Sequence, residues 1–170
     1  MKKKLPKDIS IILLGDTGVG KTSIFIRYSK NKFTENYIST ISADFERKNI
    51  EYKNKTYSFR IYDTAGQERF RSIAKSYFHF ADCFIIIFDL TNKVSLISVP
   101  TWIDLIKDFN ENPLFIILGN KNDLKNSQIP QAEIEQVIQN INNFNEEKFF
   151  KVSAKSGDNI NEAFYKMIDL

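Results

Sequence analysis

Short apolar runs of strand length alternate along this chain with segments whose apolar residues recur at helical spacing. The predominantly apolar runs are expected to form strands, and they are Ile9–Leu14, Cys83–Asp89, Leu114–Leu118 and Phe149–Val152. Apolar runs without alternation suit parallel strands that are buried on both faces of a sheet. Helices are expected over Lys21–Lys30, Val94–Phe109, Gln131–Ile141 and Ile160–Ile168.

Two further segments alternate between apolar and polar residues with the period of a half-buried strand. Phe45–Tyr52 and Thr56–Tyr62 flank the polar triplet Lys53-Asn54-Lys55, which predicts a β-hairpin. The order of strand, helix, hairpin and then repeated strand–helix pairs predicts an α/β fold with a doubly wound sheet. Pro100 lies within one helical pattern, where its ring clashes with the preceding turn, so we expect a kink or a helix start there.

Length and composition fit one domain in a reducing compartment. The chain has 170 residues, a net charge of +3 and a single cysteine, Cys83, so a disulfide within the chain is excluded. The small charge argues against nucleic acid as the main partner. Residues 1–7 are basic, and we expect a flexible, solvated start there, with contact to anionic lipid or RNA as the less favoured alternative. Residues 8–170 are expected to form the folded domain.

The segment Gly15–Thr22, with the sequence GDTGVGKT, is a complete phosphate-binding P-loop between a predicted strand and a predicted helix. Its glycines let backbone N–H groups surround a phosphate, and the following helix presents its positive end to the same anion. Lys21 is expected to contact the β- and γ-phosphates, and the Thr22 hydroxyl is expected to bind Mg²⁺. The other predicted nucleotide contacts in or directly after this loop are Asp16, Thr17, Gly18, Val19, Gly20 and Ser23.

The tetrapeptide Asn120-Lys121-Asn122-Asp123 indicates which base is bound. The Asp123 carboxylate can accept hydrogen bonds from both N1–H and the 2-amino group of guanine. Adenine offers neither donor, so its binding would leave a buried carboxylate unpaired. Asn120 and Lys121 stand with Asp123 at the end of a predicted strand, where a doubly wound sheet binds its ligand. This arrangement argues for a guanine nucleotide and against a P-loop kinase or ATPase.

Two more segments follow predicted strands and complete the candidate site. In Asp63-Thr64-Ala65-Gly66-Gln67, Asp63 is expected to hold Mg²⁺ through water. The Gly66 N–H is expected to contact the γ-phosphate, and Gln67 is expected to orient the attacking water. In Ser153-Ala154-Lys155, the Ala154 N–H is expected to reach the guanine carbonyl.

The chain resembles the Rab family of small GTPases over essentially its whole length. Ile41–Phe45 resembles IGVDF, Arg69–Ile73 resembles RFRSI, Tyr77–Ala81 resembles YYRGA and Phe88–Asn92 resembles YDITN. Together these segments are more similar to Rab proteins than to Ras-, Rho-, Arf- or Ran-like relatives. The resemblance implies a P-loop small GTPase fold with a six-stranded, mostly parallel sheet, one antiparallel edge strand and helices on both faces, so residues 8–170 would be the GTPase domain.

The resemblance also implies roles for residues at matching positions. Phe33 would lie against the guanine base. Thr40 would be the switch I threonine, which contacts Mg²⁺ and the γ-phosphate only in the GTP state. The implied catalytic residues are Gln67, Lys21 and Thr40. An aromatic triad that binds effectors in the family is matched by Phe45, Tyr62 and Tyr77. The alternative for this triad is that all three rings simply pack inward.

The implied function is that of a molecular switch that binds GTP or GDP with Mg²⁺, hydrolyses GTP slowly and regulates vesicle traffic through effectors. Its other partners would be an exchange factor and an activating protein. The family implies a cytoplasmic protein that cycles onto the cytosolic face of endomembranes through a prenylated tail. Leu170 ends the chain without a prenylation cysteine, so we expect this sequence to lack that tail. A nucleotide-locked adaptor with little hydrolysis is the alternative, and Gln67 and Thr40 argue against it.

Three positions depart from the family pattern. Ser42 stands where the family usually has glycine, Tyr62 stands for tryptophan, and Phe80 stands for glycine. None of them belongs to the implied catalytic set. We therefore expect the departures to affect the choice of partner rather than hydrolysis.

Overall fold

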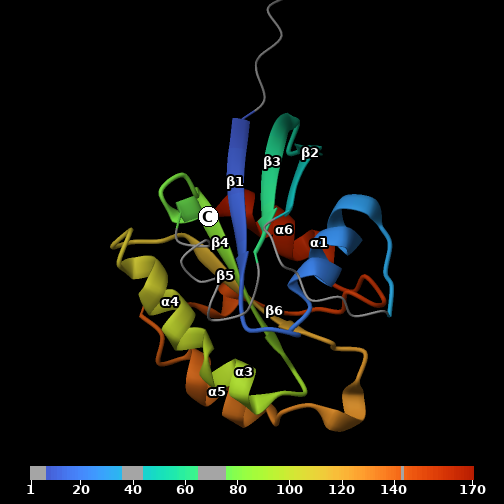
Figure 1. Cartoon of the computed structure of the whole chain (residues 1–170), viewed down its shortest axis with the longest axis vertical. Helices are drawn as coiled ribbons and strands as arrows, with labels where there is room; N and C mark the ends of the chain where they lie inside the picture. Colours follow the sequence, from blue (N-terminus) through green and yellow to red (C-terminus); the bar gives the residue numbers. More distant parts are fainter. Residues whose placement is uncertain (1–6, 36–43, 65–75, 143) are drawn as a thin grey trace, which may run out of the picture.

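The computed structural model describes residues 7–35, 44–64, 76–142 and 144–170, which build a six-stranded sheet flanked by helices (Figure 1). The strands are β1 (Lys7–Leu14), β2 (Asp44–Tyr52), β3 (Lys55–Asp63), β4 (Cys83–Asp89), β5 (Phe115–Asn120) and β6 (Phe149–Lys151). The helices are α1 (Lys21–Lys30), α3 (Lys93–Ile97), α4 (Val99–Lys107), α5 (Gln131–Ile138) and α6 (Ile160–Asp169). The basic residues 1–6 lie outside the described residues.

The strand order is β2-β3-β1-β4-β5-β6, and only β2 runs antiparallel to its neighbour. The predicted mostly parallel sheet with one antiparallel edge strand is therefore confirmed. The chain leaves β1 toward β3 on one side, whereas the later strands extend the sheet on the other side. The change of direction lies at the carboxyl end of β1, which is where sheets of this kind bind ligands.

The β2–β3 hairpin is closed by two residues in the left-handed conformation. Lys53 has a φ of 49° and Asn54 has a φ of 59°, while Tyr52 and Lys55 are cross-strand partners. A two-residue turn of this type matches the right-handed twist of the flanking strands. The predicted hairpin is confirmed, and Lys55 is the first residue of its second strand rather than part of the turn.

Each face of the sheet has its own hydrophobic core (Figure 1). Alternate residues of β1 enter different cores: Ile11 and Leu13 pack with α1 and α6, whereas Ile12 and Leu14 pack with α3, α4 and α5. Residues of β4 and β5 are buried throughout. Because helices cover both faces, these strands can be apolar at every position, which explains their uninterrupted runs.

The helical pattern around Pro100 is split into two helices. Helix α3 ends at Ile97, and α4 begins at Val99 with Pro100 in its first turn. Proline is tolerated there because the first turn of a helix has N–H groups without intrahelical partners. The helix start predicted near Pro100 is confirmed. The buried residues of α4 include Trp102, whose indole contacts the P-loop.

Candidate functional site

The predicted P-loop joins the carboxyl end of β1 to the amino end of α1. Gly20, the residue before the helix, has a φ of 98°, which a residue with a side chain rarely adopts. A Cβ on Gly20 would also lie 2.3 Å from Asn120 Nδ2. The loop can therefore close against β5 only with glycine at this position. Of the other loop residues, Thr17 and Gly18 are exposed, Asp16 is half-buried and Val19 is buried.

Lys21 lies buried beneath the P-loop. Its ammonium group donates hydrogen bonds of 2.9 Å to the carbonyl oxygens of both Gly15 and Asp16. Burial lowers the pKa of Lys21 to about 8, and the carboxylates of Asp63 and Asp16 oppose this effect. At neutral pH most molecules therefore keep the positive charge that a phosphate ligand would need.

The two predicted metal residues in the described part of the chain lie next to each other. The Thr22 hydroxyl donates a 2.6 Å hydrogen bond to Asp63 Oδ2, and Asp63 is fully buried. A hydroxyl and a carboxylate are the oxygen ligands that Mg²⁺ prefers, so this pair fits the ion. Among the described residues, no group of three or more histidines, cysteines, aspartates and glutamates is placed to hold a metal. A magnesium site here would thus need oxygen atoms from the nucleotide or water as well.

Asn120 connects three loops at the carboxyl edge of the sheet. Its side chain donates to the carbonyl of Val19 in the P-loop at 2.9 Å and accepts from the N–H of Ala154 at 3.1 Å. Asn120 is buried, so both bonds are shielded from water. Asn120 was predicted to bind the nucleotide, and it lines the candidate cavity; the structure adds that it links the P-loop to the Ser153–Lys155 segment.

Asp123 is oriented by the neighbouring loop. Its Oδ1 accepts a 2.6 Å hydrogen bond from the buried Ser153 hydroxyl. Asp123 lines a cavity of about 280 Å³ together with residues from the P-loop, from the segment after α1 and from the loops after β5 and β6. These lining residues are Gly18, Gly20, Ser23, Phe33, Thr34, Glu35, Asn120, Lys121, Asp123, Leu124, Ala154 and Lys155. The fold thus brings most of the predicted nucleotide residues to one cavity.

Arg27 was missed in the sequence analysis. Its Nε donates to the carbonyl of Ala154 at 2.8 Å, and its Nη2 donates to the carbonyl of Lys155 at 2.6 Å. The guanidinium of α1 therefore holds the Ser153–Lys155 segment in place. Nothing in the sequence near Arg27 marks this role, because its acceptors are 127 and 128 residues away.

Two more side chains outside the nucleotide-binding motifs support predicted site residues. Asp89, at the end of β4, forms a 2.6 Å ion pair with Lys121, which has a left-handed φ of 67°. The Trp102 indole donates a 2.9 Å hydrogen bond to Asp16 Oδ1. The first contact fixes Lys121, which lines the cavity, and the second fixes Asp16 of the P-loop, so the site depends on β4 and α4 as well as on its own loops.

Some predicted residues cannot be placed. Thr40, Gly66 and Gln67 lie outside the described residues, and so does Ser42. The catalytic and ligand-binding roles of Thr40, Gly66 and Gln67 therefore remain predictions, as does the effect of Ser42 on the choice of partner.

The predicted aromatic triad comes together at the start of β2 and the end of β3. The Phe45 and Tyr62 ring centroids lie 5.1 Å apart, and those of Tyr62 and Tyr77 lie 5.3 Å apart. Phe80, one of the three departures from the family pattern, joins them at 5.4 Å from Tyr62 and 5.6 Å from Tyr77. Phe45 and Phe80 are each 47% exposed, whereas Tyr62 and Tyr77 are half-buried. We call these four residues the aromatic cluster.

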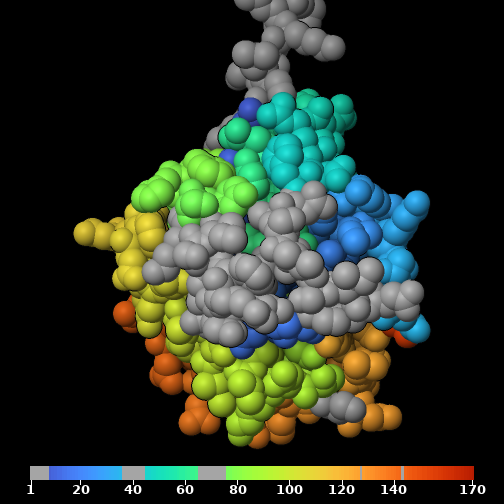
Figure 2. All heavy atoms as spheres, in the orientation of Figure 1, coloured from blue at the N-terminus to red at the C-terminus, as the bar shows by residue number. Residues whose placement is uncertain are grey.

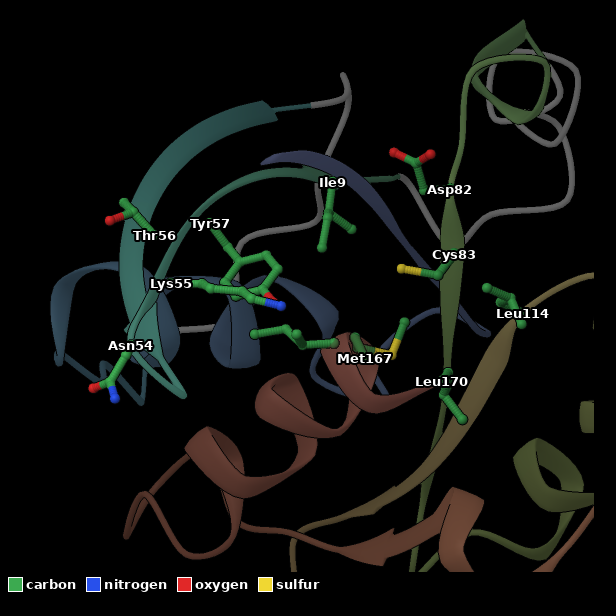
Figure 3. Close-up of a pocket in the computed structure, with 11 residues that line it drawn as sticks. Ile9, Asn54, Lys55, Thr56, Tyr57, Asp82, Cys83, Leu114, Met167 and Leu170 are labelled. Carbon is green, nitrogen blue, oxygen red and sulfur yellow. The ribbon is translucent and has the colours of Figure 1, made fainter. Parts of the chain in front are cut away.

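A second and larger cavity lies at the opposite edge of the sheet (Figure 3). Its volume is about 620 Å³, and its lining comes mainly from the first residues of β1, β3 and β4 and the last residues of α6. Lys55 and Tyr57 face the Cys83 and Met167 side chains across it (Figure 3). Its described lining residues include no glycine loop and no helix amino terminus, so they lack the features that bind phosphate. No helix in the described residues has the length and apolarity needed to cross a bilayer.

Comparison with known proteins agrees with this arrangement. Residues 10–170 match the Ras family. The chain is 38% identical over 156 residues to Ras-related protein Rab-1 of Theileria parva, which covers 91% of this chain and 70% of that protein. It is 38% identical over 170 residues to Ras-related protein Rab-7a of Paramecium octaurelia (96% and 79% covered) and 35% identical over 161 residues to GTP-binding protein Rab-3D of Rattus norvegicus (94% and 72%). The chain therefore belongs to the Ras family and, within it, to the Rab small GTPases, enzymes that hydrolyse GTP to GDP and act in vesicle traffic.

Proposed function

We propose that this Rab GTPase is a nucleotide-dependent switch that binds GTP or GDP with Mg²⁺, hydrolyses GTP slowly and binds effectors through the aromatic cluster. The observation that carries the proposal is the Asp123 carboxylate, held by Ser153 at the rim of a cavity that Asn120 and Ala154 also line. Only a base with two adjacent donors can pair with such a carboxylate, and guanine is that base. The Phe33 ring would complete the recognition, together with the Ala154 N–H, which donates to Asn120 Oδ1 here and would turn to the guanine carbonyl when the base binds.

The catalytic contribution of the chain would be electrostatic positioning. Lys21 and the P-loop N–H groups would stabilise charge that develops on the phosphate oxygens, while Gln67 would hold the attacking water. Thr22, Asp63 and, in the GTP state, Thr40 would hold Mg²⁺, which neutralises phosphate charge when bound. The 17 residues between Thr22 and Thr40 are too few for a domain that supplies an arginine in cis. A partner would supply it, with a stimulation on the order of 10⁵-fold in the related protein Ras.

The choice of base tests the proposal. Asp123→Asn replaces an acceptor by a donor, so affinity for GTP should fall at least about 100-fold because two hydrogen bonds to a charged acceptor are lost. Affinity for xanthosine triphosphate should rise, since xanthine presents a carbonyl where guanine has its amino group. Competition titrations with a fluorescent nucleotide measure both changes, and Asp104→Asn on α4 is the matched control. Equal affinity of the unmodified chain for ATP and GTP would contradict the proposal.

Hydrolysis distinguishes the switch from a nucleotide-locked adaptor. Gln67→Leu should leave the variant loaded with GTP in single-turnover assays with an activating protein, with a rate at least about 100-fold lower, a loss typical of removing a group that positions a proton-transferring water. The unmodified chain should release phosphate in the same assay. If the unmodified chain kept its GTP under these conditions, the adaptor would be the better description.

A further inference from the structure

The sheet face that carries the aromatic cluster continues into a pair of arginines. Arg47 of β2 and Arg60 of β3 are direct cross-strand partners. They lie two residues along their strands from Phe45 and Tyr62, which are also partners. Alternation along each strand places all four side chains on the same face. In the space-filling view, the teal surface of the hairpin lies next to the green surface around residue 80 (Figure 2). We call Arg47 and Arg60 the arginine pair.

Like charges directly opposite each other destabilise a sheet unless an anion separates them. The arginine pair has little compensation among the described residues. Arg47 Nη2 lies 3.9 Å from Asp8 Oδ2, at the limit of an ion pair. The Arg60 Nε is buried and has no hydrogen-bond partner in the part of the chain that the structure describes. An unpaired buried donor of this kind is costly to keep.

Neighbouring side chains whose positions the structure describes do not supply the missing acceptor. The hydroxyls of Ser10 and Ser58 lie on the same face as Arg60, and each is buried without a hydrogen-bond partner among residues 7–35, 44–64, 76–142 and 144–170. Asp82 Oδ2, from the far side of β1, accepts a 2.7 Å hydrogen bond from the Ser10 N–H. Among the described residues, the positive charge beside the aromatic cluster is therefore balanced only in part, by Asp8, and an anion from outside would complete it.

We propose that this surface binds a protein segment that places an apolar or aromatic side chain on the aromatic cluster and a carboxylate on the arginine pair. The proposal rests on effector binding, as proposed above, and adds the chemistry of the partner. The carboxylate matches the planar guanidinium groups, which bind it through two parallel hydrogen bonds. The exposed rings of Phe45 and Phe80 favour a protein partner over a bare phosphate, because aromatic residues are frequent anchors in protein interfaces. Phe80 adds a ring that the family usually lacks, so it would contribute to selectivity.

A random peptide library displayed on phage tests the proposal, with selection on the chain loaded with a non-hydrolysable GTP analogue. Selected peptides should combine an aspartate or glutamate with an aromatic residue at a recurring spacing. Their synthetic forms should bind ~5–30-fold more weakly to Arg47→Gln, Arg60→Gln and Phe80→Ala in fluorescence anisotropy, the range expected for interface anchors. Lys151→Gln, which removes a cation from the opposite edge strand β6, should leave binding unchanged. Peptides without acidic residues, or equal affinity for all variants, would overturn the proposal.

Three further measurements separate the possible failures. Arg47→Gln removes one of two like charges that face each other, so the thermal unfolding midpoint of the variant should stay the same or rise while peptide binding falls. A lower midpoint would mean that Arg47 stabilises the fold instead, and it would overturn the proposal. Vesicles containing phosphatidylserine should not bind in an Arg60-dependent manner, since such binding would make membrane phosphate the ligand. Nucleotide titration of every variant shows whether the switch itself is intact. Loss of nucleotide binding in the unmodified chain would reject the proposed function, whereas intact nucleotide binding without acidic peptides would reject only this inference.

Discussion

The two cavities at opposite edges of the sheet differ in size and in chemistry. The cavity at the amino edge has a volume of about 620 Å³, and the one at the carboxyl edge has only about 280 Å³. The larger cavity is lined mainly by strand starts and by the end of α6, with Lys55 and Asp82 as its charged residues. Four loops line the smaller cavity, and hydrogen bonds from the side chains of Asn120, Ser153 and Arg27 link loops around it.

In this protein, the convergence of polar groups therefore identifies the candidate nucleotide site better than cavity volume does. All parallel strands point their carboxyl ends, and the loops that follow them, to the same edge of the sheet. Backbone N–H groups, a helix amino terminus and a buried lysine therefore meet there, and hydrogen bonds hold them in position before any ligand binds. As far as the structure describes the chain, the amino edge receives no such groups. The following variants test how far the hydrogen bonds, rather than the space, determine nucleotide binding.

The largest effect is expected for Asn120→Ala. The change leaves the Val19 carbonyl and the Ala154 N–H unpaired in a buried position, so nucleotide affinity should fall by about 3–4 kcal/mol. Dissociation of a fluorescent GDP analogue measures the loss. Leu114→Ala in the amino-edge cavity is the control, and it should change affinity by less than about 0.5 kcal/mol because Leu114 is 42% exposed and far from the loops. Equal losses for the two variants would remove the distinction between the cavities.

Gly20→Ala should lower the free energy of unfolding by about 2–3 kcal/mol. Its left-handed φ strains any side chain, and the new methyl group would also collide with Asn120 Nδ2. Gly18→Ala is the matched comparison, since Gly18 has a φ of 79° but open space around it. It should cost only about 1–1.5 kcal/mol, from the backbone conformation alone. Urea unfolding of both nucleotide-free variants measures the difference, and a Gly18 variant as unstable as the Gly20 variant would show that the collision does not matter.

The smallest effect is expected for Arg27→Ala. It removes two hydrogen bonds from a half-buried guanidinium to the Ser153–Lys155 segment, so nucleotide affinity should fall by about 1–2 kcal/mol. Most of the loss should appear as faster GDP dissociation, which stopped-flow fluorescence measures, because the segment would hold the base less firmly. Arg27→Lys is the control, since one ammonium cannot donate in the same fork to both carbonyls. A full rescue by lysine would mean that charge alone matters at this position.

Local patterns in the sequence were sufficient for most of the architecture. The apolar runs, the helical spacing and the break at Pro100 depend on neighbouring residues, so they identified the strands, the hairpin and the bounds of α1. The P-loop and the Asn120–Asp123 segment were also predicted from the sequence, because each consists of residues that are close in sequence. The ends of some elements were predicted less well: α5 ends at Ile138 rather than at Ile141, and β6 ends at Lys151 rather than at Val152.

Contacts between distant segments were decided only by the tertiary structure. Asn120 bonds to Val19 across 101 residues, and Arg27 bonds to Ala154 across 127 residues. Phe80 was noted as a departure from the family pattern, but its place beside Tyr62 depends on how the segment around residue 80 packs against the end of β3. Sequence spacing carries no information on such pairs, because they arise where separate strands end at one edge of the sheet or lie on one face of it. The residue types of the site were thus set by the sequence, and the links that hold them together were set by the fold.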